Sequence, residues 1–162
     1  MKLYDWPNSY NSKKIRAVAF ETDTRLELVP VDMTKGEHKT PQFLAKNPNG
    51  KVPVLEDGSF TVWESNAIIC YLAAQDSSRR LLPQDPKRRS QVDRWMFWQT
   101  AHLSPSIGKI SYERLWKARM GQGASDESVV AQAMPEVERY LGVLDSWLHP
   151  SARSPVESRP RS

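Results

Sequence analysis

Two short segments of this 162-residue chain combine residue types that could bind an extended peptide. Residues 47–55 have the sequence NPNGKVPVL, in which Pro53 interrupts an apolar run typical of a β-strand. A proline removes a backbone donor from a strand and is normally excluded from its interior. A cis Val52–Pro53 bond, which costs about 0.5–1 kcal/mol before proline, would turn the N–H and C=O of Val52 outward. That backbone could then pair with a peptide ligand as an added strand would.

The second segment, residues 64–68 with the sequence ESNAI, begins a predicted helix. A helix N-terminus offers unpaired N–H groups and a partial positive charge, so it favours an anion. The Ser65 hydroxyl could also bind a carboxylate, and the Glu64 side chain could bind an ammonium group. Together the segments predict a site for a peptide with a free amino-acid end. The structural alternatives are that Pro53 protects an edge strand and that Glu64 and Ser65 only cap the helix.

The elements around these segments predict an α/β domain with a small mixed sheet. Residues 2–5 and 26–31 are strand candidates, and the run between them places Ile15, Val18 and Ala19 on one helical face. A short helix, a hairpin about an Asp-Gly turn and a longer helix follow, at residues 41–46, 52–62 and 64–74. The order β-α-β followed by β-β-α is thioredoxin-like, with helices on both faces of the sheet.

A change of composition divides the chain. Residues 1–77 make the α/β domain, and residues 78–86, rich in Ser, Arg and Pro, are a predicted linker. Residues 87–148 have only helical periodicity, in one run with a kink at Pro105 and a second helix that starts near Ser125. This part predicts an incomplete all-α domain, because two amphipathic helices need further helices to cover them.

The last stretch, residues 149–162, is composed mainly of Ser, Arg and Pro. Such a composition leaves little apolar surface to bury and predicts disorder. Periodicity stops abruptly at His149, and we therefore expect a truncation or an altered reading frame at this point.

Overall composition excludes several classes of protein. The single cysteine, Cys70, excludes a disulfide framework, a CxxC redox pair and a cysteine-based zinc site within one chain. The net charge is +4, and the polar tail supplies part of it, so the body of the protein is only mildly basic. Nucleic-acid binding is therefore only weakly supported. No apolar stretch approaches the ~20 residues of a membrane span. We expect a cytoplasmic protein without a metal, a nucleic-acid partner or a membrane partner.

Three stretches, taken jointly, resemble the glutathione S-transferase family. They are residues 47–55, residues 63–72 (WESNAIICYL) and residues 81–86 (LLPQDP), the last of which leads into a helix with Arg and Trp. The resemblance extends over residues 1–148 and is greatest to serine-type, phi- or theta-like members, bacterial ones included. It implies a thioredoxin-like glutathione-binding domain followed by the beginning of the all-α domain.

The resemblance implies ligand contacts for individual residues. Val52 would pair with the cysteinyl part of glutathione, next to the cis proline Pro53. Glu64 and Ser65 would hold the γ-glutamyl end. The residues implied for the glycine carboxylate are basic: His38, Lys39 and Lys51. His38 and Lys39 could instead be solvated surface residues.

The reactive position is expected in residues 7–12, where the first helix begins. Ser9 is the first choice, because its hydroxyl and the helix dipole would together stabilise the thiolate of bound glutathione. The protein would then lower a thiol pKa and supply no covalent nucleophile. Tyr10, Asn11 and Ser12 are rivals, and Ser9 could also act as a helix N-cap.

Trp95, Trp98 and His102 lie on the helix that in this family lines the electrophile site and the dimer interface. Aromatic residues at helical spacing are equally typical of a core. The resemblance implies a homodimer that conjugates glutathione to hydrophobic electrophiles, with activity impaired by the truncation. One alternative is a non-catalytic glutathione-binding or regulatory protein. Another is a glutathione-dependent reductase or peroxidase, which normally needs a cysteine where Ser9 stands.

Overall fold

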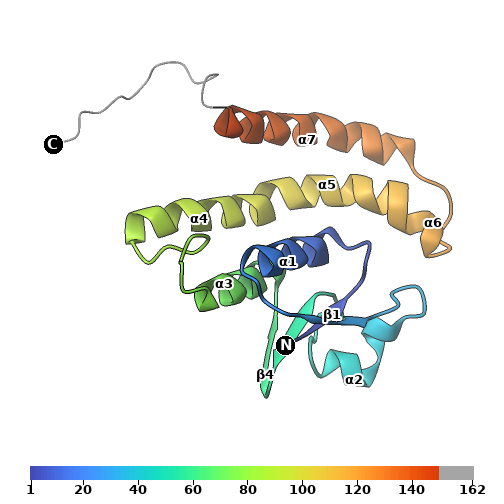
Figure 1. Cartoon of the computed structure of the whole chain (residues 1–162). Coiled ribbons are helices and arrows are strands. Elements are labelled where there is room, and N and C mark those ends of the chain that lie inside the picture. The colour runs from blue at the N-terminus through green and yellow to red at the C-terminus, as the bar shows by residue number, and fades with distance from the viewer. Residues whose placement is uncertain (150–162) are drawn as a thin grey trace. The chain divides into compact units, whose positions relative to one another are not determined.

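The computed structural model describes residues 1–149, which form two compact units divided between Asp93 and Arg94 (Figure 1). Residues 76–85, within the predicted linker, lie outside helices and strands, although Leu82 is buried. The predicted domain bounds remain a prediction. The predicted tail, residues 149–162, lies outside the described residues except for His149, which follows the last helix.

The first unit contains a four-stranded sheet with the strand order β2-β1-β3-β4. The strands are β1 (Lys2–Asp5), β2 (Glu27–Pro30), β3 (Val54–Asp57) and β4 (Phe60–Trp63). β1 runs parallel to β2 and antiparallel to β3, while β3 and β4 form a hairpin. Gly58 adopts the left-handed φ of 59° that the hairpin turn requires. The predicted thioredoxin-like arrangement is confirmed.

Helices cover both faces of this sheet (Figure 1). They are α1 (Tyr10–Glu21), α2 (Pro41–Leu44) and α3 (Ser65–Gln75), with a short 3₁₀ helix, η1, at Glu37–Lys39. Because successive strand residues point to opposite faces, Leu3 and Leu55 pack under α1 and α3, while Val54 packs with Phe43 of α2. The larger core cluster consists of Leu3, Ile15, Ala19, Leu55, Ile68 and Leu72.

Two element boundaries differ from the prediction, and both lie at the candidate site. β3 begins at Val54 and not at Val52, because Pro53 has no N–H to contribute to the ladder. α3 begins at Ser65, and Glu64 is its N-cap with φ 71° and ψ 112°. Val52, Pro53 and Glu64 are thus placed just outside the regular elements, where their backbone groups are not committed to a ladder.

The second unit is helical within the described residues. Its segments are α4 (Pro86–Trp98, which crosses the division), η2 (Gln99–Leu103), α5 (Ser104–Ser111), η3 (Tyr112–Trp116), α6 (Lys117–Arg119) and α7 (Glu127–Leu148). The expected kink at Pro105 takes the form of a π-helical stretch, η2, just before it. Proline cannot donate to the carbonyl four residues earlier, and a π-turn accommodates that loss.

α7 lies alongside α5 in this unit (Figure 1) and buries one stripe of its surface. The stripe has helical spacing and consists of Val130, Ala133, Val137 and Tyr140. Pro135 lies inside this helix on the exposed side, a feature that the sequence analysis did not anticipate. Within residues 1–149, every helix is either too short or too polar to cross a membrane.

A stability prediction follows from the start of α7. The Asp126 carboxylate accepts hydrogen bonds from the N–H groups of Ser128, at 2.9 Å, and Val129, at 3.4 Å. Replacing Asp126 by Ala should lower the free energy of unfolding by about 1 kcal/mol, because those two N–H groups lose their partner. Urea denaturation followed by helical circular dichroism measures the change.

The matched control for this variant is Glu138→Ala, at an exposed position within the same helix. It should change the free energy of unfolding by no more than about 0.5 kcal/mol. Equal midpoints for the Asp126 and Glu138 variants would show that the cap does not stabilise α7.

Candidate functional site

A polar pocket of about 150 Å³ in the first unit brings the two segments from the sequence together. Its wall consists of Asn11, Asn47, Lys51, Val52, Pro53, Glu64 and Ser65. The Val52–Pro53 peptide bond at its edge is cis. Five of the residues expected to contact a ligand therefore share one cavity, although they come from a loop, a helix cap and a helix first turn.

The loop that carries Lys51 is held from inside by Asn47, which is 3% exposed. Asn47 Nδ2 donates to the carbonyl of Lys51 at 2.6 Å, and its Oδ1 accepts from the N–H of Asn49 at 3.0 Å. A Cβ atom at Gly50 would lie 3.1 Å from the carbonyl oxygen of His38, and Gly50 has φ 57°. The loop therefore needs glycine at this position and presents the Lys51 side chain to solvent.

The opposite wall is formed by Glu64 and the first turn of α3. A φ of 71° is uncommon for a residue other than glycine, and such strain concentrates at binding sites. The Glu64 side chain is exposed, whereas Ser65 is 8% exposed and its Oγ donates to Asn11 Oδ1 at 3.2 Å. This wall thus combines the N–H groups of a helix N-terminus with a hydroxyl and a carboxylate. It suits a ligand with a carboxylate for the N–H groups and the hydroxyl, and an ammonium group for the Glu64 carboxylate.

Three hydrogen bonds hold the turn before α1. The N–H of Ser9 donates to the carbonyl of Trp6 at 2.8 Å, and the Ser9 side chain accepts from the N–H of Ser12 at 3.3 Å. Arg16 donates to the carbonyl of Pro7 at 3.2 Å. Ser9 is therefore the N-cap of α1, as one of the sequence alternatives stated. A capping serine can still turn its hydroxyl hydrogen toward a ligand, because it uses only an oxygen lone pair for the cap.

The four candidates for the reactive position differ in exposure. Ser9 is half-buried and Tyr10 is 43% exposed, whereas Ser12 is fully buried. Asn11 is the candidate that lines the polar pocket. A contact to the ligand sulfur by Ser9 stays a prediction, with Asn11 as its strongest rival on geometric grounds.

His38 and Lys39 lie on η1, beside the loop that carries Gly50, and not on the pocket wall. His38 is 6% exposed, and burial lowers its pKa, as does the nearby Lys39 charge. The imidazole is therefore neutral at neutral pH and would meet a carboxylate as a hydrogen-bond donor only. Lys39 is exposed and keeps its charge available to solvent. Their contact with a glycine carboxylate stays a prediction.

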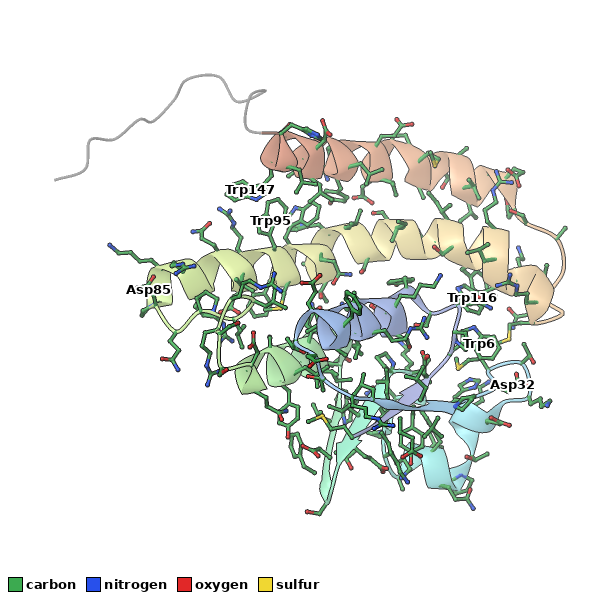
Figure 2. The ribbon with its side chains drawn as sticks, in the orientation of Figure 1. Trp6, Asp32, Asp85, Trp95, Trp116 and Trp147 are labelled. Carbon is green, nitrogen blue, oxygen red and sulfur yellow. The ribbon has the colours of Figure 1, made fainter. Side chains whose placement is uncertain are left out.

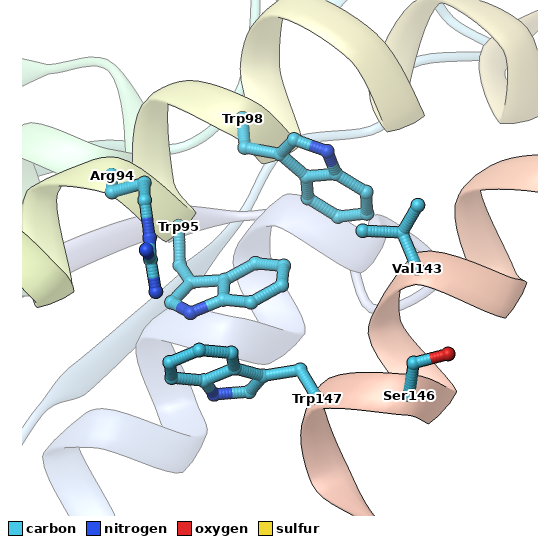
Figure 3. Close-up of a pocket in the computed structure, with 6 residues that line it drawn as sticks. All are labelled: Arg94, Trp95, Trp98, Val143, Ser146 and Trp147. Atoms are coloured by element: carbon cyan, nitrogen blue, oxygen red, sulfur yellow. The ribbon is translucent and has the colours of Figure 1, made fainter. Parts of the chain in front are cut away.

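A second, apolar pocket of about 400 Å³ lies in the helical unit between α4 and α7 (Figures 2 and 3). Trp95 lies with its ring centroid 5.1 Å from that of Trp98 and 5.4 Å from that of Trp147. The Arg94 guanidinium lies 4.6 Å from the centre of the Trp147 ring. The lining residues are Arg94, Trp95, Trp98, Val143, Ser146 and Trp147. Such an aromatic wall with one cation suits flat, electron-poor molecules.

His102, the third residue predicted for the electrophile, does not line this pocket. It is exposed, and its ring centroid lies 5.7 Å from that of Tyr140. Another hollow of about 320 Å³ shares Trp95, Trp98 and Trp147 with the first. The structure thus gathers two of the three predicted residues and leaves His102 on the helix surface.

Comparisons with known proteins agree with this fold. The family model "Glutathione S-transferase, N-terminal domain" matches residues 1–74. Over 148 residues the chain is 35% identical to the probable glutathione S-transferase GSTF2 of rice, Oryza sativa subsp. japonica, covering 91% of this chain and 69% of the relative. The chain belongs to the glutathione S-transferase family.

Solved members of the family have the same fold as this glutathione S-transferase. One is the theta class enzyme of the citrus canker pathogen Xanthomonas axonopodis pv. citri with glutathione bound, with a TM-score of 0.81 and 34% identity over 91% of this chain and 69% of that one. Another is glutathione S-transferase I of maize in complex with an atrazine glutathione conjugate, with a TM-score of 0.79 and 28% identity over 91% and 68%.

Asn47 lines the polar pocket but was not among the residues expected to contact a ligand. Lys14, on α1 outside the pocket wall, was not assigned a role. Lys14 lies three positions after Asn11 on α1, and that spacing places both on one helical face, so the signal was present. Lys14 Nζ donates to Asn66 Oδ1 at 2.6 Å.

Proposed function

We propose that this chain binds glutathione in the polar pocket and activates its thiol for transfer to a hydrophobic electrophile. The observation that carries the proposal is the shared pocket of Val52, Pro53, Glu64 and Ser65 in a member of the glutathione S-transferase family. The ligand chemistry matches: glutathione has a peptide backbone, a free amino-acid end and a thiol. The glutathione bound to the Xanthomonas relative supports the same choice of ligand.

Each part of glutathione has a proposed partner. The N-terminus of α3 and the Ser65 hydroxyl bind the α-carboxylate of the γ-glutamyl end, and Glu64 binds its ammonium group. The backbone of Val52 pairs with the cysteinyl residue. Lys51 attracts the glycine carboxylate, and the His38 and Lys39 segment lies beside the same loop at Gly50.

The chemical step requires the thiolate form of glutathione. The N-terminus of α1 and the Ser9 hydroxyl stabilise the negative sulfur relative to the thiol, which raises the fraction of nucleophile at neutral pH. An electron pair of the sulfur then forms the new bond to the electrophilic carbon. The bond from that carbon to the leaving group breaks, and the leaving group departs with its two electrons. The protein contributes binding and electrostatics, and no side chain becomes covalently modified.

We propose that the apolar pocket of the helical unit binds the hydrophobic electrophile, with Trp95 and Trp98 as its contacts. An electron-poor aromatic compound would stack on their indole rings. The conjugate bound to the maize relative contains atrazine, which supports an aromatic class of electrophile. We further propose that the chain works in the cytoplasm as a homodimer, on the strength of its family membership.

Two successive assays test the proposed function. The purified chain is applied to immobilised glutathione, and the retained protein is then assayed with glutathione and 1-chloro-2,4-dinitrobenzene. We expect retention followed by turnover. Retention without turnover would instead support a glutathione-binding protein that lacks catalysis, and failure to be retained would overturn both readings.

A further inference from the structure

The wall of the apolar pocket in the helical unit contains one charged side chain, Arg94. Its guanidinium carbon lies 4.6 Å from the centre of the Trp147 ring and 5.6 Å from that of the Trp95 ring. Figure 3 shows the guanidinium at the edge of the Trp95 ring that carries the indole nitrogen. A guanidinium has five N–H donors, so contact with two rings leaves donors for a ligand.

The charge of Arg94 is not balanced by a neighbouring carboxylate. The acidic residue next to it in the sequence, Asp93, is already paired with Arg89, with 2.9 Å between Oδ1 and Nε. Arg94 is exposed, and within the described residues its side chain contacts aromatic rings and forms no ion pair. A cation at the edge of an apolar pocket therefore remains available to an anion.

The other polar groups on this wall also favour an acceptor. Trp95 Nε1 is buried and has no hydrogen-bond partner in the part of the chain that the structure describes. An indole nitrogen can only donate, and a buried donor without a partner is costly. The Ser146 hydroxyl already uses its hydrogen on the carbonyl of Gly142, at 2.8 Å. A ligand that fits this pocket should thus bring acceptors and a negative charge.

We propose that this pocket binds planar aromatic compounds that carry a carboxylate or a sulfonate, and that Arg94 selects them. The inference rests on the proposed function and deepens it, because it assigns a charge to the electrophile. The aromatic part lies against the indole rings, and the acidic group accepts hydrogen bonds from the guanidinium. Arg94 takes no part in the reaction at sulfur.

The size and the exposed edge of the pocket agree with such a ligand. Its volume of about 400 Å³ lies within the range of small-molecule sites. The Arg94 side chain lies at the edge of the Trp95 ring that carries Nε1, and exposed side chains change rotamer within nanoseconds. A small shift of this side chain would let the acidic group reach both Arg94 and Trp95 Nε1.

Two fluorescent probes with the same rings test the selection directly. 8-Anilinonaphthalene-1-sulfonate carries the acidic group, and N-phenyl-1-naphthylamine lacks it. Arg94→Met removes the charge and keeps an apolar stem, and Arg94→Lys keeps the charge without the planar fork. Arg88→Met is the matched control, because Arg88 is exposed on the same helix but does not line the pocket. The titrations use the full chain without glutathione, so they do not depend on glutathione binding.

The dissociation constants should separate the two probes. Arg94→Met should weaken binding of the sulfonate by about five- to tenfold, as expected for a charge-assisted contact that solvent partly screens. Binding of the naphthylamine should change by less than about twofold, because the apolar stem remains. Arg94→Lys should weaken the sulfonate by only about two- to threefold. Arg88→Met should leave both constants unchanged.

A further variant locates the probes. Trp147 is 39% exposed at the end of α7, and its ring forms part of the pocket wall. Trp147→Leu should therefore weaken both probes, in contrast to Arg94→Met. Binding of both probes that is unchanged in Trp147→Leu would place them outside this pocket and overturn the inference.

Conjugation should show the same selection by charge. The substrates are 4-chloro-3,5-dinitrobenzoate and its neutral amide, 4-chloro-3,5-dinitrobenzamide, with glutathione at saturation. Arg94→Met should raise KM for the benzoate by about five- to tenfold and KM for the amide by less than about twofold. A benzoate KM that does not depend on Arg94 would overturn the charge assigned to the electrophile.

The binding results can also contradict the inference. Equal losses of both probes in Arg94→Met would show that Arg94 only supports the ring wall, and no loss would remove it from the site. An equal loss of the sulfonate in Arg88→Met would indicate general attraction to a basic surface. Each of these results would overturn the selection by Arg94. A chain that selects the sulfonate but is not retained on immobilised glutathione would instead overturn the proposed function, while the anion preference of the pocket would stand.

Discussion

Replacement of Ser9 by Ala is expected to lower kcat for conjugation by roughly 10–30-fold at neutral pH, because the thiolate fraction of bound glutathione falls as its thiol pKa returns toward the ordinary value of about 8.5. The hydroxyl would interact with the sulfur mainly in its thiolate form, so the dissociation constant of glutathione should change little. Steady-state kinetics with saturating glutathione and an aryl halide measure kcat directly.

The cap function of Ser9 requires controls, because its side chain also accepts from the N–H of Ser12. Ser9→Asn keeps a capping acceptor but has no hydroxyl, and Ser9→Thr keeps both. We expect the Asn variant to be as slow as the Ala variant while remaining more stable, and we expect the Thr variant to retain activity. If Asn11→Ala caused the large loss and Ser9→Ala did not, the reactive contact would belong to Asn11 on the pocket wall.

Glu64→Gln is expected to raise the dissociation constant of glutathione by roughly 30–100-fold, because the ammonium group of the ligand loses its charged partner. The amide keeps the size of the carboxylate and the N-cap position at φ 71°. Titration calorimetry gives the constant, and Glu27→Gln, an exposed change on β2 of the same unit, should leave it unchanged.

The strained backbone of Glu64 permits a second variant that separates binding from folding. Glycine adopts a positive φ without steric cost, so Glu64→Gly should keep the stability of the chain or raise it by up to about 1 kcal/mol while it loses the affinity. A Glu64→Gly chain that binds glutathione as tightly as the unaltered chain would refute a role for this carboxylate.

Much of the α/β unit could be predicted, because its sequence signals are local. Alternating apolar residues indicated the strands, and the Asp57-Gly58 pair indicated the hairpin that the structure contains. Pro53 and the Glu-Ser pair indicated the candidate site for the same reason, since Pro53 interrupts a strand pattern and the pair begins a helix. The predicted start of β3 at Val52 was wrong, because an apolar pattern does not register the missing N–H of Pro53.

The remaining features depend on contacts between distant parts of the sequence. Lys14 and Asn66 have no shared motif, and their pairing requires α1 to pack on α3. In the helical unit, Trp95 and Trp98 were recognised, but Trp147 becomes their neighbour only through the packing of α4 and α7 (Figure 3). Helical periodicity also gave no indication of the π-helical stretch before Pro105.

The proposed function requires that this chain binds glutathione and shifts its thiol toward thiolate. The most direct test is a pH titration of the ultraviolet thiolate absorbance of glutathione bound to the full chain, with the Ser9→Ala variant in parallel. We expect an apparent thiol pKa about one to two units below the ordinary value of about 8.5 in the unaltered chain, and a pKa closer to 8.5 in Ser9→Ala. Bound glutathione with an unshifted thiol pKa would contradict it.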